Sequence, residues 1–137
     1  MIKHQIKEIS AEDTLHIRHQ VMWPNQTIDF VRIPNDDKGR HFGYFKNENL
    51  ISVISLFISK NDAQFRKFAT LKKYQGKGFG SELLKEVMLI SEKEKLYKIW
   101  CNARISKVDY YYKFGMIETS EKFVKGGIDY VIMERTF

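Results

Sequence analysis

The stretch LKKYQGKGFGSELLKEVM, residues 71–88, places Gly76, Gly78 and Gly80 within five positions and then continues into regularly spaced apolar residues. That spacing predicts an amphipathic helix that begins at the glycines and buries Leu83, Leu84, Val87, Met88 and Ile90. Upstream, residues 64–71 alternate like a strand, with Phe65, Lys67 and Ala69 on one side and Arg66, Phe68 and Thr70 on the other. The stretch is therefore predicted to be a strand, a glycine loop and a helix.

The loop between that strand and that helix has the properties of an anion site. A helix N-terminus offers unpaired backbone N–H groups and a positive dipole end, and glycines let a ligand come close to them. Positive side chains flank the loop: Arg66, Lys67, Lys72, Lys73 and Lys77. The dinucleotide pattern needs a glycine at Ser81, and the nucleotide-triphosphate loop needs Gly-Lys-Ser or Gly-Lys-Thr where the chain reads Gly80-Ser81-Glu82. We expect an anion other than NAD or ATP.

The remaining elements follow from alternation, helical spacing and turn residues. Strands are predicted over 2–8, 41–45, 50–58, 64–71, 98–102, 116–124 and 128–135, and helices over 11–22, after the glycine loop, and over 105–114. Ser10 and Asp13 resemble a capping box for the first helix, whereas residues 23–39 are predicted to be irregular. The order β-α-β-β-β-α-β-α-β-β predicts an α/β protein with one mixed sheet and helices packed on it.

The composition fits one folded domain over residues 1–137. Hydrophobic residues make up 43% of the chain, which is enough apolar surface for a single core. The longest apolar run, residues 50–58, is less than half the roughly 20 residues that a membrane-spanning helix needs. The single cysteine, Cys101, cannot form an intramolecular disulfide, and the N-terminal residues show no export signal. The expected setting is reducing and cytoplasmic, without a membrane partner.

Two stretches resemble the GCN5-related N-acetyltransferase (GNAT) superfamily. The loop from Gln75 to Gly80, QGKGFG, is similar to its acetyl-CoA pyrophosphate loop, in which Gln or Arg is followed by two residues, Gly, one residue, and Gly or Ala. The segment NARISKVDYYYKFGM, residues 102–116, is similar to a later strand and helix of the superfamily, with Lys107 where a small residue is usual and Met116 where Phe is usual. The element order agrees over nearly the whole chain, and residues 17–45 resemble a bacterial branch of mostly unassigned substrate.

The resemblance implies a fold, a reaction and a set of binding residues. The fold would be that of the GNAT acyl-CoA N-acyltransferases, and the reaction a transfer of acetyl from acetyl-CoA to a primary amine by direct attack within a ternary complex. Main-chain groups of Phe68 and Thr70 would hold the pantetheine arm like an added strand, and a backbone N–H there would polarise the thioester carbonyl. Asn102 would bond the arm or, alternatively, the local backbone. The implied cofactor-binding residues are Phe68, Ala69, Thr70, Gln75, Gly76, Lys77, Gly78, Phe79, Gly80, Ser81 and Asn102.

Acetyl transfer needs one group that accepts a proton and one that donates a proton. An alkyl amine, with a pKa of about 10.4, is mostly protonated at neutral pH, and a leaving thiolate, with a pKa of about 8.5, gains from receiving a proton. By the resemblance Tyr111 is the acid. The alternative is a packing role shared with Tyr110 and Tyr112, because three successive helical residues cannot all face one cleft. The base is left open among water chains, Asp36, Asp37, His41, Gln64 acting through a water, and Glu134.

Several alternatives stay open at this point. His16 and His19 lie one helical turn apart without a third ligand nearby, so no metal is expected. The formal net charge of +6 also suits a nucleic acid, but the chain shows no recognition helix or RNA-binding signature. A domain that binds CoA without turnover is the other alternative. Asp36 and Asp37 either attract a cationic amine or cap a turn, with the turn favoured, and the fold also allows a homodimer through residues 126–137.

Overall fold

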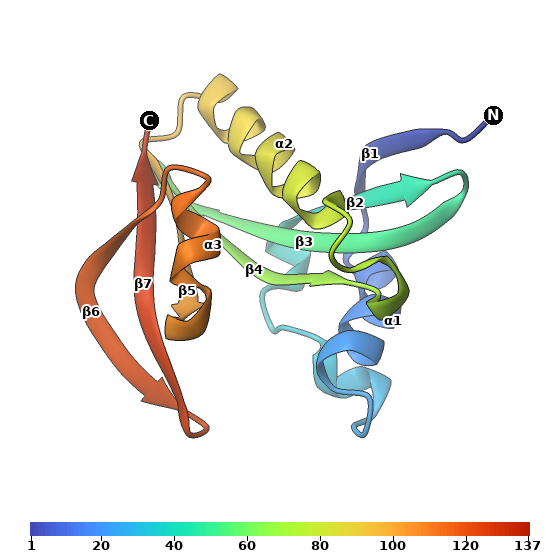
Figure 1. Cartoon of the computed structure of the whole chain (residues 1–137), viewed down its shortest axis with the longest axis horizontal. Helices are drawn as coiled ribbons and strands as arrows, with labels where there is room; N and C mark the ends of the chain where they lie inside the picture. Colours follow the sequence, from blue (N-terminus) through green and yellow to red (C-terminus); the bar gives the residue numbers. More distant parts are fainter.

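A seven-stranded mixed sheet runs through the molecule. The computed structural model describes residues 1–137. The strands lie in the spatial order β1-β2-β3-β4-β5-β7-β6, and only the neighbours β4 and β5 are parallel. Their bounds are β1 His4–Ile9, β2 Arg40–Lys46, β3 Asn49–Ser59, β4 Asp62–Thr70, β5 Lys98–Arg104, β6 Ile117–Lys125 and β7 Ile128–Thr136. With the helices α1 (Ala11–Met22), α2 (Phe79–Lys93) and α3 (Val108–Tyr112), they confirm the predicted class and element order (Figure 1).

The helices cover the sheet on its two faces. On one face, α2 buries Leu83, Leu84 and Val87 in the main core, which also receives α3. On the other face, Ile17 of α1 packs against Val53 of β3 and a residue of β4. None of the helices combines the length and the apolar character needed to cross a membrane. The Cys101 side chain is buried in the main core.

The N-terminal helix begins and ends where the sequence predicts. The Ser10 side chain accepts a hydrogen bond from the Asp13 backbone, and the Asp13 carboxylate accepts one from the Ser10 backbone, so the capping box is confirmed. The segment 23–39 that follows contains two single turns of 3-10 helix, Ile28–Val31 and Asp36–Lys38. This segment lies across the same face of the sheet as α1 and leads into β2.

Four predicted elements had boundaries that were wrong by two residues or more: β1 begins at His4 and not at residue 2, β5 ends at Arg104 and not at residue 102, and α3 and β4 also differ. The helix predicted over 105–114 is a 3-10 turn, Ile105–Lys107, followed by the short helix α3. Its last turn is closed by i to i+3 hydrogen bonds, and Gly115 then adopts a φ of +80°, which ends the helical geometry. Strand β4 begins at Asp62, two residues before its predicted start, because residues 62 and 63 already pair with β3.

The alternation predicted along β4 was also wrong, because the strand contains a β-bulge. Between the pairs Val53 with Ala69 and Ser55 with Arg66, β4 has one residue more than β3. Lys67 lies at this bulge with a φ of +52°, which is unusual for a residue other than glycine. The bulge reverses the side-chain alternation: Phe65 packs in the α2 core, whereas Ala69, four residues later, packs against α1.

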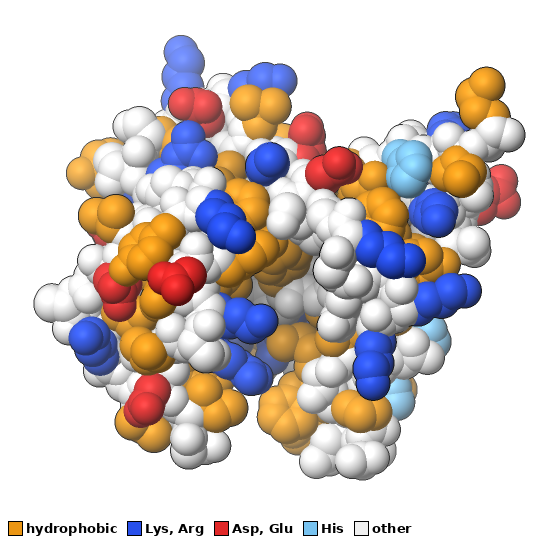
Figure 2. All heavy atoms as spheres, viewed as in Figure 1, with side chains coloured by type: hydrophobic (Ala, Val, Ile, Leu, Met, Phe, Trp, Pro, Cys, Tyr) orange, Lys and Arg blue, Asp and Glu red, His pale blue; other side chains and the backbone are white.

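The sheet opens between β4 and β5. These two strands are paired only between residues 62–64 and 98–100, and beyond that short seam they diverge (Figure 1). The divergence separates a half made of β1 to β4 from a half made of β5, β7 and β6. A hollow lies between the two halves, with apolar atoms in its depth and Lys and Arg side chains on its wall (Figure 2). The glycine loop and α3 lie on either side of the divergence.

Candidate active site

The three loop glycines are needed for two different reasons. Gly76 and Gly78 have φ angles of +75° and +87°, in the left-handed region that other residues seldom adopt. Gly80 has an ordinary φ but lies close to β4: a Cβ on it would be 3.0 Å from Thr70 Oγ1 and 3.3 Å from Phe68 Cζ. The Gln75 side chain donates a 2.8 Å hydrogen bond to the Thr70 carbonyl and so ties the loop to the end of β4. The loop is therefore pinned against the strand that precedes it.

The loop exposes a run of backbone donors at the start of α2. The first helical hydrogen bond joins Glu82 N–H to Gly78 C=O, and the backbone N–H groups of residues 76–81 donate to no protein backbone acceptor. Gly78 is the N-cap, and no side chain caps the helix. Unpaired N–H groups at the positive end of a helix dipole bind phosphate groups. This geometry fits the pyrophosphate site that the sequence predicted, and the cofactor-binding role of these residues stays a prediction.

The phenol of Tyr111 lies over the divergence of β4 and β5. Its ring packs against Phe65 of β4, with ring centroids 5.8 Å apart, and the thiol of Cys101 on β5 is near enough to affect its ionisation. Burial, with smaller contributions from Cys101 and Tyr110, raises the pKa of Tyr111 well above its usual range. The hydroxyl makes no hydrogen bond within the protein. Tyr111 is thus held as a neutral phenol with a free donor.

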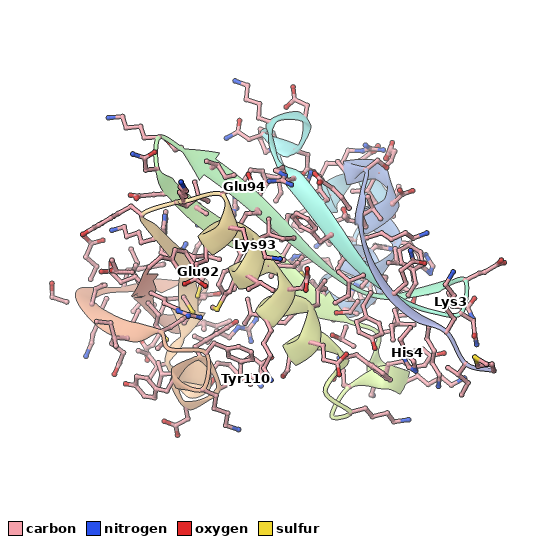
Figure 3. All side chains as sticks on the ribbon, turned by 90° about the horizontal axis from the view of Figure 1, so that it is seen from above. Lys3, His4, Glu92, Lys93, Glu94 and Tyr110 are labelled. Carbon is pink, nitrogen blue, oxygen red and sulfur yellow. The ribbon has the colours of Figure 1, made fainter.

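The neighbouring tyrosines point elsewhere, as the helical geometry requires. Tyr110 reaches from α3 toward the first turn of α2, where its hydroxyl lies 2.9 Å from Ser81 Oγ, whereas Glu92, Lys93 and Glu94 lie at the far end of α2 (Figure 3). The Tyr112 hydroxyl donates to the Glu118 carboxylate on β6. Tyr110 therefore fixes α3 against the glycine loop, and Tyr111 is the one of the three whose ring pairs with Phe65 of β4.

Main-chain groups of β4 are directed into the opening. Leu71 N–H donates to Ile51 C=O of β3, and residues of an antiparallel strand face alternate neighbours, so the main-chain groups of Thr70 and Phe68 face away from β3. On β5, Asn102 is exposed, and its side-chain amide makes no hydrogen bond to the protein. Its neighbours Cys101 and Ala103 point into the core. Asn102 therefore lies on the face opposite Tyr111. The two residues flank the opening from different faces of the sheet.

Two of the five candidate bases belong to a buried polar network. Arg18, fully buried on α1, binds Asp36 through two hydrogen bonds of 2.8 and 2.9 Å and also donates to Ser55 Oγ at 2.9 Å. His41 Nδ1 lies 2.7 Å from the same hydroxyl, and its Nε2 lies 2.9 Å from the backbone oxygen of Asp36. Burial alone would raise the pKa of Asp36, but hydrogen bonds from Arg18 and Ile33 N–H outweigh it and lower that pKa. Asp36 and His41 hold the segment 23–39 on the sheet.

The remaining candidate bases, Glu134, Asp37 and Gln64, form no hydrogen bond with the Tyr111 hydroxyl. Glu134 is paired with Lys98 at 3.3 Å, Asp37 is exposed, and Gln64 is the last paired residue of the β4–β5 seam. Of the two histidines that were weighed as metal ligands, His19 has its Nε2 2.6 Å from the backbone oxygen of Gln26, at the end of α1, and His16 is exposed. The structure therefore favours no single side chain as the base.

Sequence reasoning missed two features of this region. The buried ionic contact of Arg18 joins α1 to a residue 18 positions away, and the helical pattern alone gives no sign of it. The bulge at Lys67 has no signal in the sequence, because lysine does not favour a positive φ.

Known proteins identify the class to which this fold and site belong. The Acetyltransferase (GNAT) domain family matches residues 9–137. A Bacillus subtilis (strain 168) protein, named uncharacterized N-acetyltransferase YitI, is 32% identical over 142 residues, which cover 96% of this chain and 95% of that protein. The chain therefore belongs to the GNAT acetyltransferase family, and its class is that of the N-acetyltransferases, as predicted.

Solved structures agree on the fold. The Escherichia coli ribosomal-protein-S18-alanine N-acetyltransferase has a TM-score of 0.80 at 17% identity, with 98% of this chain and 94% of that chain covered. A Bacillus subtilis acetyltransferase in complex with CoA has a TM-score of 0.75 at 17% identity, with 100% and 99% covered. At these identities the similarity establishes a shared architecture, and the predicted GNAT fold is confirmed.

Proposed function

We propose that the protein transfers an acetyl group from acetyl-CoA to a primary amine of a small molecule or peptide, by direct attack within a ternary complex. The observation that carries the proposal is the run of free backbone N–H groups at residues 76–81, placed beside the divergence of β4 and β5. An anionic cofactor bound there can extend into the opening, where main-chain groups of Phe68 and Thr70 face away from β3 and the Thr70 carbonyl also accepts from Gln75. Acetyl-CoA supplies the activated acyl group.

The residues of this chain would divide the work between binding and proton transfer. The N–H groups of residues 76–81 would bind the pyrophosphate, with Lys77 adding charge, and the main chain of Phe68 and Thr70, on either side of Ala69, would hold the pantetheine arm. Tyr111 would donate a proton to the departing sulfur, since its raised pKa keeps it protonated. Asn102 is free to bond the arm or the acceptor. Water in the hollow would carry the proton from the amine.

Thermal unfolding with and without excess acetyl-CoA tests the proposal. At 100 times its dissociation constant a ligand stabilises the folded state by about 2.7 kcal/mol, so a clear rise in Tm is expected with acetyl-CoA and not with adenosine. Gly78→Asp should abolish that rise, because it places a negative charge and a side chain against the pyrophosphate. An unchanged Tm of the wild-type protein, or full stabilisation of Gly78→Asp, would overturn the site.

Gly127→Asp is the matched control. Gly127, in the β6–β7 turn, also has a positive φ and open space where a Cβ would lie, so its variant shares the backbone strain of the Gly78 variant. It lies in the hairpin rather than in the glycine loop. The Tm of the control should rise with acetyl-CoA as that of the wild type does. Release of thiol in the presence of amines is a second assay, which distinguishes an enzyme from a domain that only binds CoA.

A further inference from the structure

The β4 wall of the hollow carries positive charge. Arg66 lies over the ring of Phe57, 5.9 Å from its centroid, on the face that α1 covers. Lys67, at the bulge, is half-buried, and neither Arg66 nor Lys67 forms an ion pair. Burial lowers the pKa of Lys67, and the charges of Arg66, Arg18 and Lys125 lower it further, against an opposing effect of Asp36. Lys125 is the last residue of β6, so the charge of the hairpin end reaches the bulge.

The opposite wall carries positive charge on the same side of the sheet. Arg104 of β5 pairs with Tyr130 of β7, and Tyr130 pairs with Phe123 of β6. Directly paired residues share a face, and so do residues two apart, so Arg104, Phe123 and Lys125 lie on one face of this half. The rings of Phe123 and Tyr130 stack on each other, with centroids 5.2 Å apart, and add aromatic surface to this face. Arg104 and Lys125 form no ion pair.

Two carboxylates on this side are already engaged, whereas the exposed Asp37 and Glu121 form no ion pair. Asp36 is bound to Arg18, and Glu134 is bound to Lys98. The pyrophosphate site proposed above lies at the start of α2, which packs on the other face of the sheet, so that phosphate does not account for these cations. These lysine and arginine side chains on three strands that border the hollow therefore form no ion pair with a carboxylate of the chain.

We propose that the amine acceptor of this enzyme carries an anionic group, a carboxylate or a phosphate, that binds between Lys67 on β4 and Arg104 and Lys125 on β5 and β6. The inference rests on the proposed acetyl transfer and names its substrate class. The same cations would disfavour polyamines, which repel them. They would also lower the pKa of a nearby acceptor amine, since like charge disfavours its protonated form, and this offsets the lack of a dedicated base.

Four amines of graded charge test the inference in the presence of acetyl-CoA: 4-aminobutyrate, O-phosphoethanolamine, butylamine and putrescine. Rates of thiol release give kcat/KM, and titration of the CoA complex by calorimetry gives binding. We expect at least one of the two anionic amines to exceed butylamine and putrescine by about tenfold in kcat/KM. The better of the two anionic amines shows whether a carboxylate or a phosphate is recognised.

Lys67→Asn is the decisive variant, because asparagine tolerates a positive φ and removes the charge. It should lower the preference for the anionic amine about tenfold and leave the KM for acetyl-CoA unchanged. Lys60→Asn is the matched control: Lys60 is exposed in the β3–β4 turn, with a φ of +57° close to that of Lys67, and its variant should behave as wild type. Lys125→Gln, on the opposite wall, should act in the same direction as Lys67→Asn.

Three results would overturn the inference while leaving acetyl transfer intact. The first is equal or better turnover of butylamine or putrescine. The second is that neither anionic amine binds to or reacts with a protein that acetyl-CoA stabilises. The third is a preference that survives both Lys67→Asn and Lys125→Gln. A protein that acetyl-CoA fails to stabilise would instead contradict the proposed function itself, so the two failures are distinguishable.

Discussion

Gly80 and Tyr111 show how single residues position the site. A methyl group on Gly80 would press against Thr70, whose hydroxyl is 2.8 Å from Ser52 Oγ, so the loop can lie this close to β4 only with glycine there. Tyr111 lies where β4 and β5 separate, and its hydroxyl is left without a partner. Both residues were selected from the sequence by motif, and the structure adds the contacts that give each motif position a physical reason.

Tyr111→Phe should lower turnover about 100-fold, the usual size of one proton-transfer contribution, while stabilisation by acetyl-CoA stays unchanged. The raised pKa of Tyr111 keeps the phenol protonated beyond the ordinary range of tyrosine, so the wild-type rate should show no loss from this group at neutral or mildly alkaline pH. Initial rates of thiol release and Tm shifts measure the two effects separately.

Tyr112→Phe serves as the control for that experiment, because the Tyr112 hydroxyl binds Glu118 at the surface. Its turnover should match the wild-type value. Equal rates for Tyr111→Phe and wild type would instead assign Tyr111 a packing role.

At the scale of elements, the buried network between α1, the segment 23–39 and β3 fixes how the α1 face of the sheet is covered. Asp36→Asn should lower the free energy of unfolding by about 3–5 kcal/mol, because it leaves Arg18 buried and uncompensated. The double variant with Arg18→Met should recover much of this loss. The pKa of Asp36 is lower in the folded protein than in the unfolded chain. The stabilisation by the Arg18–Asp36 pair is therefore complete above the ordinary aspartate pKa and is lost as the pH falls through the lowered pKa of the folded state.

Arg32→Met provides the comparison for that prediction, measured by urea unfolding. Arg32 binds Glu12 and Asp29 but is 47% exposed, so its loss should cost less than about 1 kcal/mol. Similar losses for Asp36→Asn and Arg32→Met would mean that the buried network contributes no more than a surface pair.

For the whole molecule, stability should fall at high pH because of the buried thiol. Burial raises the pKa of Cys101 from 9.0 to about 12, so above pH 9 the unfolded chain loses this proton while the folded chain keeps it. The free energy of unfolding should therefore decrease by roughly 1.4 kcal/mol per pH unit from this group between pH 9 and 12. In Cys101→Ala, the free energy of unfolding measured with urea should fall less steeply with pH over that range. Parallel curves for the two proteins would contradict the prediction.

The sequence predicted the elements and the loop because their signals are local. The periodicity of Leu83 to Met88, the capping box at Ser10 and the glycines each depend on neighbouring residues. The β4 bulge and the Arg18–Asp36–Ser55 contacts depend on residues that become neighbours only in the fold, and periodicity carries no information about them. The effect of the Lys125 charge on the pKa of Lys67 has the same origin, because the two residues belong to different halves of the sheet.

The short seam between β4 and β5 also bears on self-association. A strand edge with unpaired main-chain groups is a template on which another chain can pair and begin to aggregate. Past Gln64 and Trp100, this protein has two such edges in the middle of its sheet. They face each other across the hollow and do not lie at the outer edges of the sheet, which β1 and β6 form. We therefore expect each inner edge to be shielded by the other from pairing with a second copy of the chain.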